Sequence, residues 1–449
     1  MAETHKGFGL LFEMGCGKTL TAIMIAGTAY QMGKVEKVLV VAPTSVCSVW
    51  PKDFAEFADF KANIKVLLGD KNRRLKLLND LDNFPFKALK VAVINYESTW
   101  RECIFDALYE WNADMIICDE SQRIKSHDAE QSKAMHKLGD QAKYKLILSG
   151  TPVQNNAIDL YSQYRFLDPT IFGTNFYQFR NRYAIMGGFN RHQIVGYKDL
   201  DQLIQKEHSI AYRVTKDEAL DLPEQTFLQR YITMSAKEKN IYDRIKRESF
   251  AELESGGQIS ATTVLTKLLR LQQFTGGFLV ADGEEKPELV SKGKLNALEE
   301  IVDDYVVDAG KKLVIFARFR PEIDIIGQML KKKKLRYGEI YGDVKLEYRG
   351  DIVKDFQTNP ETMVFLAQID TAGLGITLTA ADTCVYYSVN FNYAAYSQSL
   401  ARIHRIGQKN ACTYIHLITE GTIDEVVLKA LAKKEDLAKT VVDTWRDYF

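Results

Sequence analysis

The chain has 449 residues, with 59 Lys and Arg against 59 Asp and Glu, so its formal net charge at pH 7 is zero. Hydrophobic residues make up 46% and charged residues 26%, a composition that is typical of folded domains and excludes a mainly disordered chain. The length predicts two or three domains. The balanced charge gives no sign of a nucleic-acid partner, so such a partner would have to meet local clusters of basic residues.

The cysteines and the apolar runs indicate the compartment. Six cysteines are scattered without Cys-x-x-Cys pairs or zinc-ligand spacing, which favours a reducing compartment and argues against a zinc site. No apolar run approaches the roughly 20 residues that a membrane helix needs, and the N-terminus shows no signal-peptide pattern. We therefore expect no membrane association.

Short apolar runs alternate with amphipathic segments in the first third of the chain. The runs are 9–12, 38–42, 64–68, 91–94, 115–118 and 146–148. Several are apolar on both faces, which is typical of parallel strands covered by helices on both sides. One of the intervening segments, 20–32, has helical character and stops at Gly33. This alternation predicts an α/β domain.

The second half of the chain repeats this rhythm after a segment rich in aromatic and charged residues. Strand-like runs return at 313–316, 338–341, 363–367, 384–387 and 414–417, and a helix is expected over 422–444. We predict an α/β fold of two lobes, 1–225 and 226–449, each with a parallel sheet covered by helices. Helical insertions are expected at the junction, over about 155–220 and 235–290.

A glycine-rich turn between the first strand and the first helix predicts a phosphate site. Gly15 and Gly17 allow backbone N–H groups to wrap phosphate oxygens at the start of a helix. Lys18 would reach the β- and γ-phosphates, and the Thr19 hydroxyl would bind Mg²⁺. The strict pattern has a glycine where Phe12 stands, so only the Gly-x-Gly-Lys-Thr core is present.

Two adjacent acids end a predicted buried strand at Asp119 and Glu120. Because neighbouring residues of a strand point to opposite sides, one acid could face a metal and the other a water molecule. We expect Asp119 to be a Mg²⁺ ligand and Glu120 to be the general base. An exposed acidic strand end is the alternative reading.

The order of these and later segments resembles the superfamily-two helicase-like ATPases, and within them the Swi/Snf type of DNA-translocating motor. The matching segments are 13–19, 40–45, 95–97, 119–122, 148–155, 312–316, 371–382, 398–408 and 421–425. The resemblance covers residues 8 to 430. It implies two RecA-like lobes with ATP and Mg²⁺ in the cleft between them, and a C-terminal helix that braces the second lobe against the first.

The resemblance also assigns roles to single residues. Besides Gly15, Gly17, Lys18 and Thr19, nucleotide contacts are implied at Gln122, Gly375 and Gln398. Coupling between the lobes is implied at Ser149 and Thr151, and contacts to the nucleic-acid backbone are implied at Thr44, Ser45 and Asn95.

Arg402 and Arg405 are three residues apart, so on a helix they would share one face. Two guanidinium groups on that face could stabilise negative charge that develops on a γ-phosphate. The resemblance makes Arg405 the arginine finger and Arg402 a γ-phosphate contact. A solvated basic helix face is the alternative.

Three departures from the family pattern bear on this assignment. Only about a dozen residues precede the phosphate loop and none is Gln, so an adenine-sensing glutamine would have to come from further upstream or from a partner, or adenine selectivity is poor. Gln122 stands where His is commoner; it can still hydrogen-bond to segment 148–155 but cannot become cationic. Gln368, Asp370 and Thr377 replace typical residues, and Asp370 would repel a nearby phosphate.

Charge is unevenly distributed along the second half. Residues 311–336 carry nine basic and two acidic side chains, nine minus two giving a net +7, and the five acids within 299–308 have no basic neighbour in sequence. We expect the basic segment to contribute to nucleic-acid binding, with a solvated helix end as the alternative. The aromatic segment 176–183 is expected to form the core of a small insertion rather than to stack on bases.

The sequence therefore predicts an ATP- and Mg²⁺-dependent motor that translocates on double-stranded DNA. A strand-separating helicase acting on single-stranded DNA or RNA is a second hypothesis, and an ATP-regulated DNA-binding scaffold with little turnover is a third. We expect the protein in the cytosol of a bacterial or virus-infected cell, or in the nucleus if it is eukaryotic.

Overall fold

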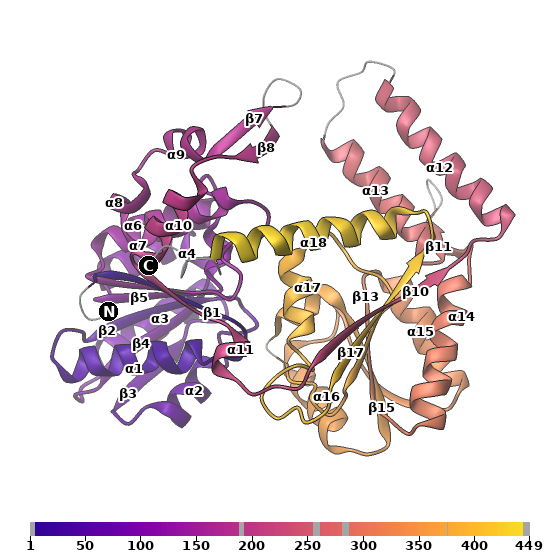
Figure 1. Cartoon of the computed structure of the whole chain (residues 1–449). Helices are drawn as coiled ribbons and strands as arrows, with labels where there is room; N and C mark the ends of the chain where they lie inside the picture. The colour runs from indigo at the N-terminus through magenta and orange to yellow at the C-terminus, as the bar shows by residue number, and fades with distance from the viewer. Residues whose placement is uncertain (1–4, 188–192, 255–260, 281–286, 375, 443–449) are drawn as a thin grey trace. The chain divides into compact units, whose positions relative to one another are not determined.

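The computed structural model describes residues 5–187, 193–254, 261–280, 287–374 and 376–442. The chain forms two compact units, one made of 1–221 and 434–449 and the other of 222–433. Each unit is built on a mainly parallel sheet covered by helices (Figure 1), which confirms the predicted α/β fold class. Within the described ranges, no helix has both the length and the apolar character of a membrane span.

The first unit contains a seven-stranded parallel sheet in the order β3-β4-β2-β5-β6-β1-β9. Its strands are β1 (Gly7–Phe12), β2 (Lys37–Ala42), β3 (Ala62–Val66), β4 (Leu89–Asn95), β5 (Met115–Asp119), β6 (Tyr144–Leu148) and β9 (Ala211–Val214). The first six overlap the six apolar runs. The strand β9 was not predicted, and it extends the sheet beyond β1, with Leu11 opposite Arg213.

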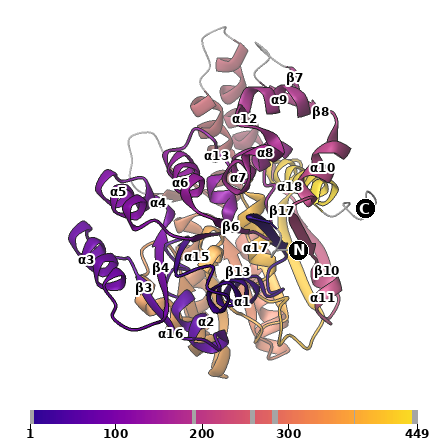
Figure 2. The same ribbon diagram turned by 90° about the vertical axis from the view of Figure 1, so that its left-hand side faces the viewer.

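Helices cover both faces of this sheet. They are α1 (Lys18–Gln31), α2 (Trp50–Phe57), α3 (Lys71–Asp82), α4 (Tyr96–Thr99), α5 (Glu102–Trp111), α6 (Glu130–Gln141) and α7 (Leu160–Leu167). The helices α1 and α2 pack on one face through side chains such as Ile23, Ala26 and Phe54, and α6 and α7 lie on the opposite face (Figure 1). The helix α3 lies beside β3 and β4 at the sheet edge (Figure 2).

The segment expected to be a mostly helical insertion is more mixed than predicted. It contains α8 (Pro169–Phe172), α9 (Phe176–Tyr183), α10 (Leu200–His208) and α11 (Lys216–Ala219), but also a hairpin of β7 (Ala184–Gly187) and β8 (Gln193–Tyr197). The expected aromatic core is present: Phe179 and Tyr183 are buried, while Tyr177 is exposed. The hairpin was not predicted, because β8 is only partly buried and lacks a continuous apolar run.

The second unit contains a six-stranded parallel sheet in the order β10-β17-β16-β13-β15-β14. The strands are β10 (Gln225–Ile232), β13 (Leu313–Ala317), β14 (Arg336–Ile340), β15 (Thr362–Gln368), β16 (Thr383–Tyr386) and β17 (Cys412–Thr419). The strand β10 was not predicted. It is an edge strand, exposed along almost its whole length, so it shows no apolar run.

Helices cover this second sheet as well. The helices of this unit are α12 (Ala236–Glu254), α13 (Ala261–Thr275), α14 (Gly293–Val302), α15 (Arg320–Lys332), α16 (Leu346–Thr358), α17 (Tyr393–Leu400) and the first part of α18 (Ile423–Val442), whose residues from 434 onward belong to the first unit. The helices α14 and α15 pack on one face, and α16, α17 and α18 pack on the other (Figure 1). A small antiparallel pair, β11 (Phe278–Val280) with β12 (Pro287–Leu289), follows α13.

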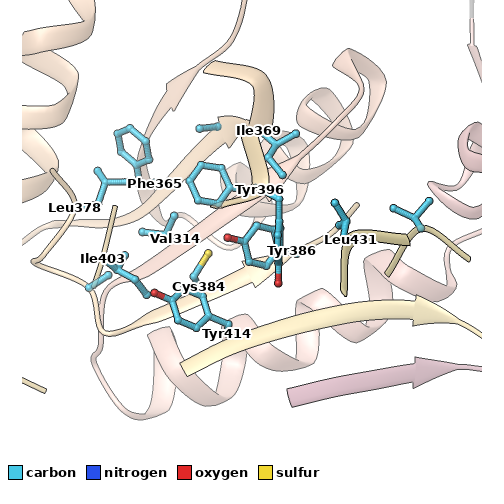
Figure 3. Packing of buried hydrophobic residues seen from close by; sticks show 14 of the residues in the cluster. Val314, Phe365, Ile369, Leu378, Cys384, Tyr386, Tyr396, Ile403, Tyr414 and Leu431 are labelled. Carbon is cyan, nitrogen blue, oxygen red and sulfur yellow. The ribbon is translucent and has the colours of Figure 1, made fainter. Parts of the chain in front are cut away.

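Figure 3 shows the core that fixes the later motifs of this unit. One cluster of fully buried side chains holds Leu378 from segment 371–382 and Ile403 from segment 398–408. Ile369, which lies just before segment 371–382, belongs to the same cluster, together with Val314 and Tyr414. Burying large apolar side chains at this density leaves their backbone little freedom. The polar residues beside them are therefore held in fixed positions.

The segregation of charge along the sequence is not maintained in space. Lys333, from the basic segment, forms ion pairs with Asp303 at 2.7 Å and with Glu299 at 3.1 Å. Arg336 pairs with Asp355 at 3.1 Å. The packing of α15 beside α14 brings the acidic and basic segments together, so part of the net +7 is neutralised locally. Lys331, Lys332 and Lys334 are exposed.

A buried histidine in this core makes stability depend on pH. His416 is 5% exposed, its Nε2 lies 3.0 Å from the Tyr396 hydroxyl, and burial lowers its pKa from 6.5 to about 4. The unfolded chain therefore binds a proton between these values that the folded chain does not, and stability is lost as pH falls below 6.5. We expect His416→Gln to reduce the acid destabilisation between pH 7 and 5 by about 2 kcal/mol.

Urea unfolding of both proteins at the two pH values measures this difference. Gln retains a hydrogen-bonding group for Tyr396 but does not titrate, so the comparison isolates the proton. Equal acid destabilisation of the two proteins would contradict the assignment to His416.

Candidate nucleotide site

The phosphate loop runs from the end of β1 to the start of α1, as predicted. Gly15 and Gly17 have φ values of 89° and 83°, which residues with a side chain rarely adopt, and a Cβ atom at either position would meet open space. The loop is therefore an uncovered cradle of backbone N–H groups at a helix N-terminus. Thr19 is the second residue of α1 and is half-buried.

Lys18 turns its amine back onto the loop. Its Nζ donates to the carbonyl oxygen of Phe12 at 2.9 Å and to that of Glu13 at 3.2 Å. Burial lowers the pKa of Lys18, while the nearby Glu120 and Asp119 carboxylates oppose that shift. The Lys18 amine thus lies among negatively charged and carbonyl oxygens, and its positive charge would be available to a phosphate bound in the loop.

Asp119 is the last residue of β5 and is buried, with 6% exposure. The indole Nε1 of Trp50 donates to its Oδ2 at 3.1 Å, and the Tyr96 hydroxyl donates to its backbone oxygen at 2.9 Å. Burial, followed by the charge of Glu120, raises the pKa of Asp119. No local sequence pattern indicates the contact with Trp50, which precedes Asp119 by 69 positions.

Glu120 is oriented by a turn and not by strand alternation, which corrects the expectation. It follows the end of β5 and has a left-handed backbone, with φ 51° and ψ 55°. Gln122 donates from Nε2 to Glu120 Oε2 at 2.6 Å and accepts at Oε1 from the Ser149 hydroxyl at 2.8 Å. The Ser149 oxygen in turn accepts from the backbone N–H of Thr151 at 3.1 Å.

This chain of hydrogen bonds joins the acid pair to the turn after β6. Gln122, Ser149 and Thr151 are all buried. The expected hydrogen bond from Gln122 to this turn is present, so the amide performs that function without a histidine. Gly150 lies against the phosphate loop, where an added Cβ would be 3.3 Å from the Phe12 oxygen and 3.6 Å from Lys18 Nζ.

The donor set fits Mg²⁺, which prefers oxygen ligands and keeps several of its waters. Thr19 offers a hydroxyl and Asp119 a carboxylate, and both lie in the unit that carries the phosphate loop. Among the described residues no group of three or more His, Cys, Asp or Glu forms a self-sufficient metal site. An ion held by Thr19 and Asp119 would therefore depend on phosphate oxygens and water for its other ligands.

The residues expected to contact nucleic acid lie at the carboxyl ends of β2 and β4. Thr44 is exposed and Ser45 half-buried in the turn after β2, and Asn95 ends β4 with 7% exposure. The Asn95 Nδ2 donates to Glu97 at 2.8 Å, and its Oδ1 accepts from Arg74 Nη1 at 3.2 Å. The α3 residue Arg74 was not predicted, because α3 is far from Asn95 in sequence.

Arg402 and Arg405 belong to the second unit, and the helix predicted for them ends before they begin. The helix α17 stops at Leu400, and residues 401–407 form turns. The two guanidinium groups still converge, since Nη1 of Arg402 and Nη1 of Arg405 lie 3.3 and 3.5 Å from the Ile376 oxygen. The backbone N–H of Leu378 donates to the Arg402 oxygen at 2.9 Å, which fixes the two segments together.

Three other residues of this part of the chain were named from the sequence: Gln398, Gly375 and Asp370. Gln398 is half-buried on α17. Gly375 lies outside the described residues. Asp370 accepts from Asn390 Nδ2 at 2.8 Å. Burial lowers the pKa of Arg318, and the charge of Asp370 opposes that shift. The Asp370 carboxylate is therefore partly balanced within the protein, so its repulsion of a phosphate is weaker than the sequence suggested.

Comparison with known proteins identifies the family. Residues 2–276 match the SNF2-related domain, and residues 293–407 match the helicase conserved C-terminal domain. The chain belongs to the SNF2-related family. An uncharacterized ATP-dependent helicase of Mycoplasma genitalium is 26% identical over 98% of this chain and 40% of its own length. A chromodomain-helicase-DNA-binding protein 1-like of Danio rerio is 28% identical over 99% of this chain and 43% of its own.

A solved Sulfolobus solfataricus SWI2/SNF2 ATPase core in complex with dsDNA is 26% identical, with a TM-score of 0.44 over 99% of this chain and 90% of the other. The chain spans less than half the length of the two curated relatives named above.

Proposed function

We propose that this SNF2-family chain is a DNA-dependent ATPase that hydrolyses ATP to ADP and phosphate and translocates along double-stranded DNA. The observation that carries the proposal is the buried chain from Glu120 through Gln122 and Ser149 to the Gly150 turn, which lies against Lys18. A change of charge at the γ-phosphate would alter the hydrogen bonds of this series of side chains, because low-dielectric surroundings strengthen each of those bonds.

Each residue of the first unit has one task in this reaction. The loop glycines and Lys18 bind the phosphates, and Thr19 and Asp119 hold Mg²⁺, which would neutralise phosphate charge when bound. Glu120 accepts the proton of the attacking water, whose oxygen forms the new bond to the γ-phosphorus as the bond to ADP breaks. Gln122 orients Glu120, and Ser149 and Thr151 carry the change to the rest of the fold.

The second unit supplies positive charge in the same proposal. Arg405 stabilises the transferred phosphoryl group, Arg402 contacts the γ-phosphate, and Gly375 and Gln398 contribute nucleotide contacts. Both guanidinium groups approach the Ile376 carbonyl oxygen, which carries a partial negative charge. A phosphate oxygen carries a larger negative charge and would be a stronger acceptor for the same groups.

The proposed DNA face is the edge formed by the carboxyl ends of β2 and β4. Thr44 and Ser45 would donate to the phosphate backbone, with Asn95 and Arg74 behind them. The Danio rerio relative is named for DNA binding, which supports DNA as the partner. Because the net charge of the chain is zero, the positive charge that such a sequence-independent grip needs must come from local basic residues such as Arg74.

We expect duplex DNA to stimulate ATP turnover about tenfold or more, and the stimulation to weaken steeply with added salt, since phosphate contacts release counterions. The measurement is the ATPase rate with no nucleic acid, duplex DNA, single-stranded DNA and RNA, each across a salt series. Triplex displacement without duplex unwinding on matched substrates would separate a translocase from a strand-separating helicase.

The neighbouring arginines of α3 give a matched control for this experiment. Arg74→Met should raise the duplex concentration needed for half-maximal stimulation, whereas Arg73→Met removes the same charge from an exposed position next to it. Equal ATPase rates with all four nucleic-acid conditions would contradict the translocase proposal. Turnover that is negligible under all conditions would favour the scaffold hypothesis.

A further inference from the structure

A buried arginine of the unpredicted strand β9 contacts the phosphate loop. Arg213 is 5% exposed and lies opposite Leu11 in the sheet. Its Nη1 donates to the Leu11 oxygen at 2.9 Å and to the Gly150 oxygen at 3.2 Å, and its Nη2 donates to Glu13 Oε1 at 3.0 Å. One planar group thus joins the end of β1, the first residue of the loop and the turn after β6.

Glu13 is held on its other side as well. Its second carboxylate oxygen, Oε2, accepts from the backbone N–H of Lys216 at 2.9 Å, and its own backbone N–H donates to the Val214 oxygen at 2.8 Å. Both oxygens of the Glu13 carboxylate therefore have donors. The start of the loop is fixed to β9 and α11 through side chain and backbone together.

This fixed residue defines the place of the Lys18 amine. The Glu13 carbonyl accepts from Lys18 Nζ at 3.2 Å and from the backbone N–H of Cys16 at 3.2 Å. On the other side of the amine lies Gly150, whose carbonyl Arg213 also contacts. The guanidinium group therefore sets the spacing between the two backbone segments that flank Lys18.

We propose that Arg213 is a positioning residue for nucleotide binding, which holds the phosphate loop and the Gly150 turn at the separation that the Lys18 amine requires. This inference rests on the proposed function of the loop as an ATP site. Arg213 contacts the backbone of Leu11 and Gly150 and the carboxylate of Glu13, so we assign it an action through the loop and not on the phosphates.

The fork geometry of the guanidinium group is essential to this role. A lysine at 213 would keep the charge but present one ammonium group, which cannot bridge Glu13, Leu11 and Gly150 in the same way. We expect Arg213→Lys to raise the KM and the Kd for ATP about tenfold, since hydrogen bonds from a charged group are lost. The kcat should change much less than the KM.

Arg165 offers a matched control in the same unit. It forms a two-pronged ion pair with Asp140 at 2.8 and 2.9 Å between α7 and α6. Arg165→Lys makes the same chemical change in a pair that contacts no part of the loop. Glu13→Gln changes the partner of Arg213 in the ion pair, and the Glu13 side chain is partly exposed. This substitution should also raise the KM for ATP.

Alkylation of Cys16 gives a readout that needs no nucleotide. Cys16 is the half-buried thiol of the loop, burial raises its pKa, and the four cysteines Cys47, Cys118, Cys384 and Cys412 are buried. If Arg213 holds the loop, Arg213→Lys should increase the Cys16 alkylation rate severalfold, measured by peptide mass spectrometry. The buried cysteines serve as internal controls for global unfolding.

The outcomes separate the two levels of the proposal. A higher KM and faster Cys16 labelling in Arg213→Lys and Glu13→Gln, but not in Arg165→Lys, would support it. Unchanged KM and unchanged Cys16 labelling would overturn it, as would equal effects in Arg165→Lys. If the wild-type protein binds no ATP, the proposed function fails, and Cys16 labelling alone decides whether Arg213 positions the loop.

Discussion

Replacing Glu120 with glutamine is expected to lower the DNA-stimulated kcat about a thousandfold, the middle of the range for loss of a general base. The Glu120 carboxylate accepts from Gln122 Nε2 at 2.6 Å, and an amide oxygen at the same place can still accept that bond. The amide cannot take a proton from water. The KM for ATP should therefore change little while kcat falls.

A surface glutamate of the same unit provides the control. Glu130 is exposed on α6 and forms an ion pair with Lys133, three residues further on, at 2.8 Å. Glu130→Gln should therefore leave both kcat and KM unchanged. Steady-state ATPase assays and a fluorescent-nucleotide titration measure kcat and binding separately. A Glu120→Gln protein with a kcat within about tenfold of wild type would place the general base on another residue.

Most of the strands that the sequence predicted are buried on both faces, although the partly buried edge strands β3 and β14 also showed apolar runs. The segments 38–42 and 313–316 are fully apolar runs, and the structure has β2 and β13 there with almost every side chain buried. The strand β10 could not be found in this way, because its edge position leaves Phe227, Leu228 and Tyr231 half exposed. The extended conformation of β10 is stabilised by its hydrogen bonds to β17. Because β17 is distant in sequence, the local pattern of residues around β10 does not reveal this pairing.

The candidate site shows the same limit. Lys18, Asp119 and Glu120 were predicted because they lie at the end of the buried strand β5 or in the turn that connects β1 to α1, where local sequence determines the geometry. Trp50 and Arg213 were missed because their partners lie 69 and about 200 positions away. Nothing in the residues around Arg213 distinguishes a buried arginine from an exposed one.

Arg402 and Arg405 of the second unit approach one acceptor, but not through the helix face that their spacing suggested. Spacing of three residues predicted a shared helix face, but the chain has already left α17 and forms turns. Their convergence comes from the backbone: Ile403 between them is fully buried, and the Ile376 carbonyl accepts from both. Burial of one apolar residue thus determines the direction of two charged ones.

Arg405→Lys is expected to lower kcat by about a thousandfold, within the range measured for the loss of an arginine finger. Lysine retains the charge but cannot make two parallel hydrogen bonds to phosphoryl oxygens, so the loss should fall on the transition state. Binding of ATP in the ground state should weaken far less. Arg405 is only partly buried, and its 3.5 Å contact with the Ile376 oxygen is long, so the free energy of unfolding should remain unchanged.

Lys409 gives the matched control for this change, because it is exposed four residues further on. Lys409→Met removes a charge from the same segment and should leave kcat unaltered. Arg402 is 6% exposed, so its replacement should lower stability as well as kcat, and the pair can be told apart by urea unfolding. An Arg405→Lys protein with wild-type kcat would show that the phosphoryl charge is stabilised by Arg402 or by a group outside this segment.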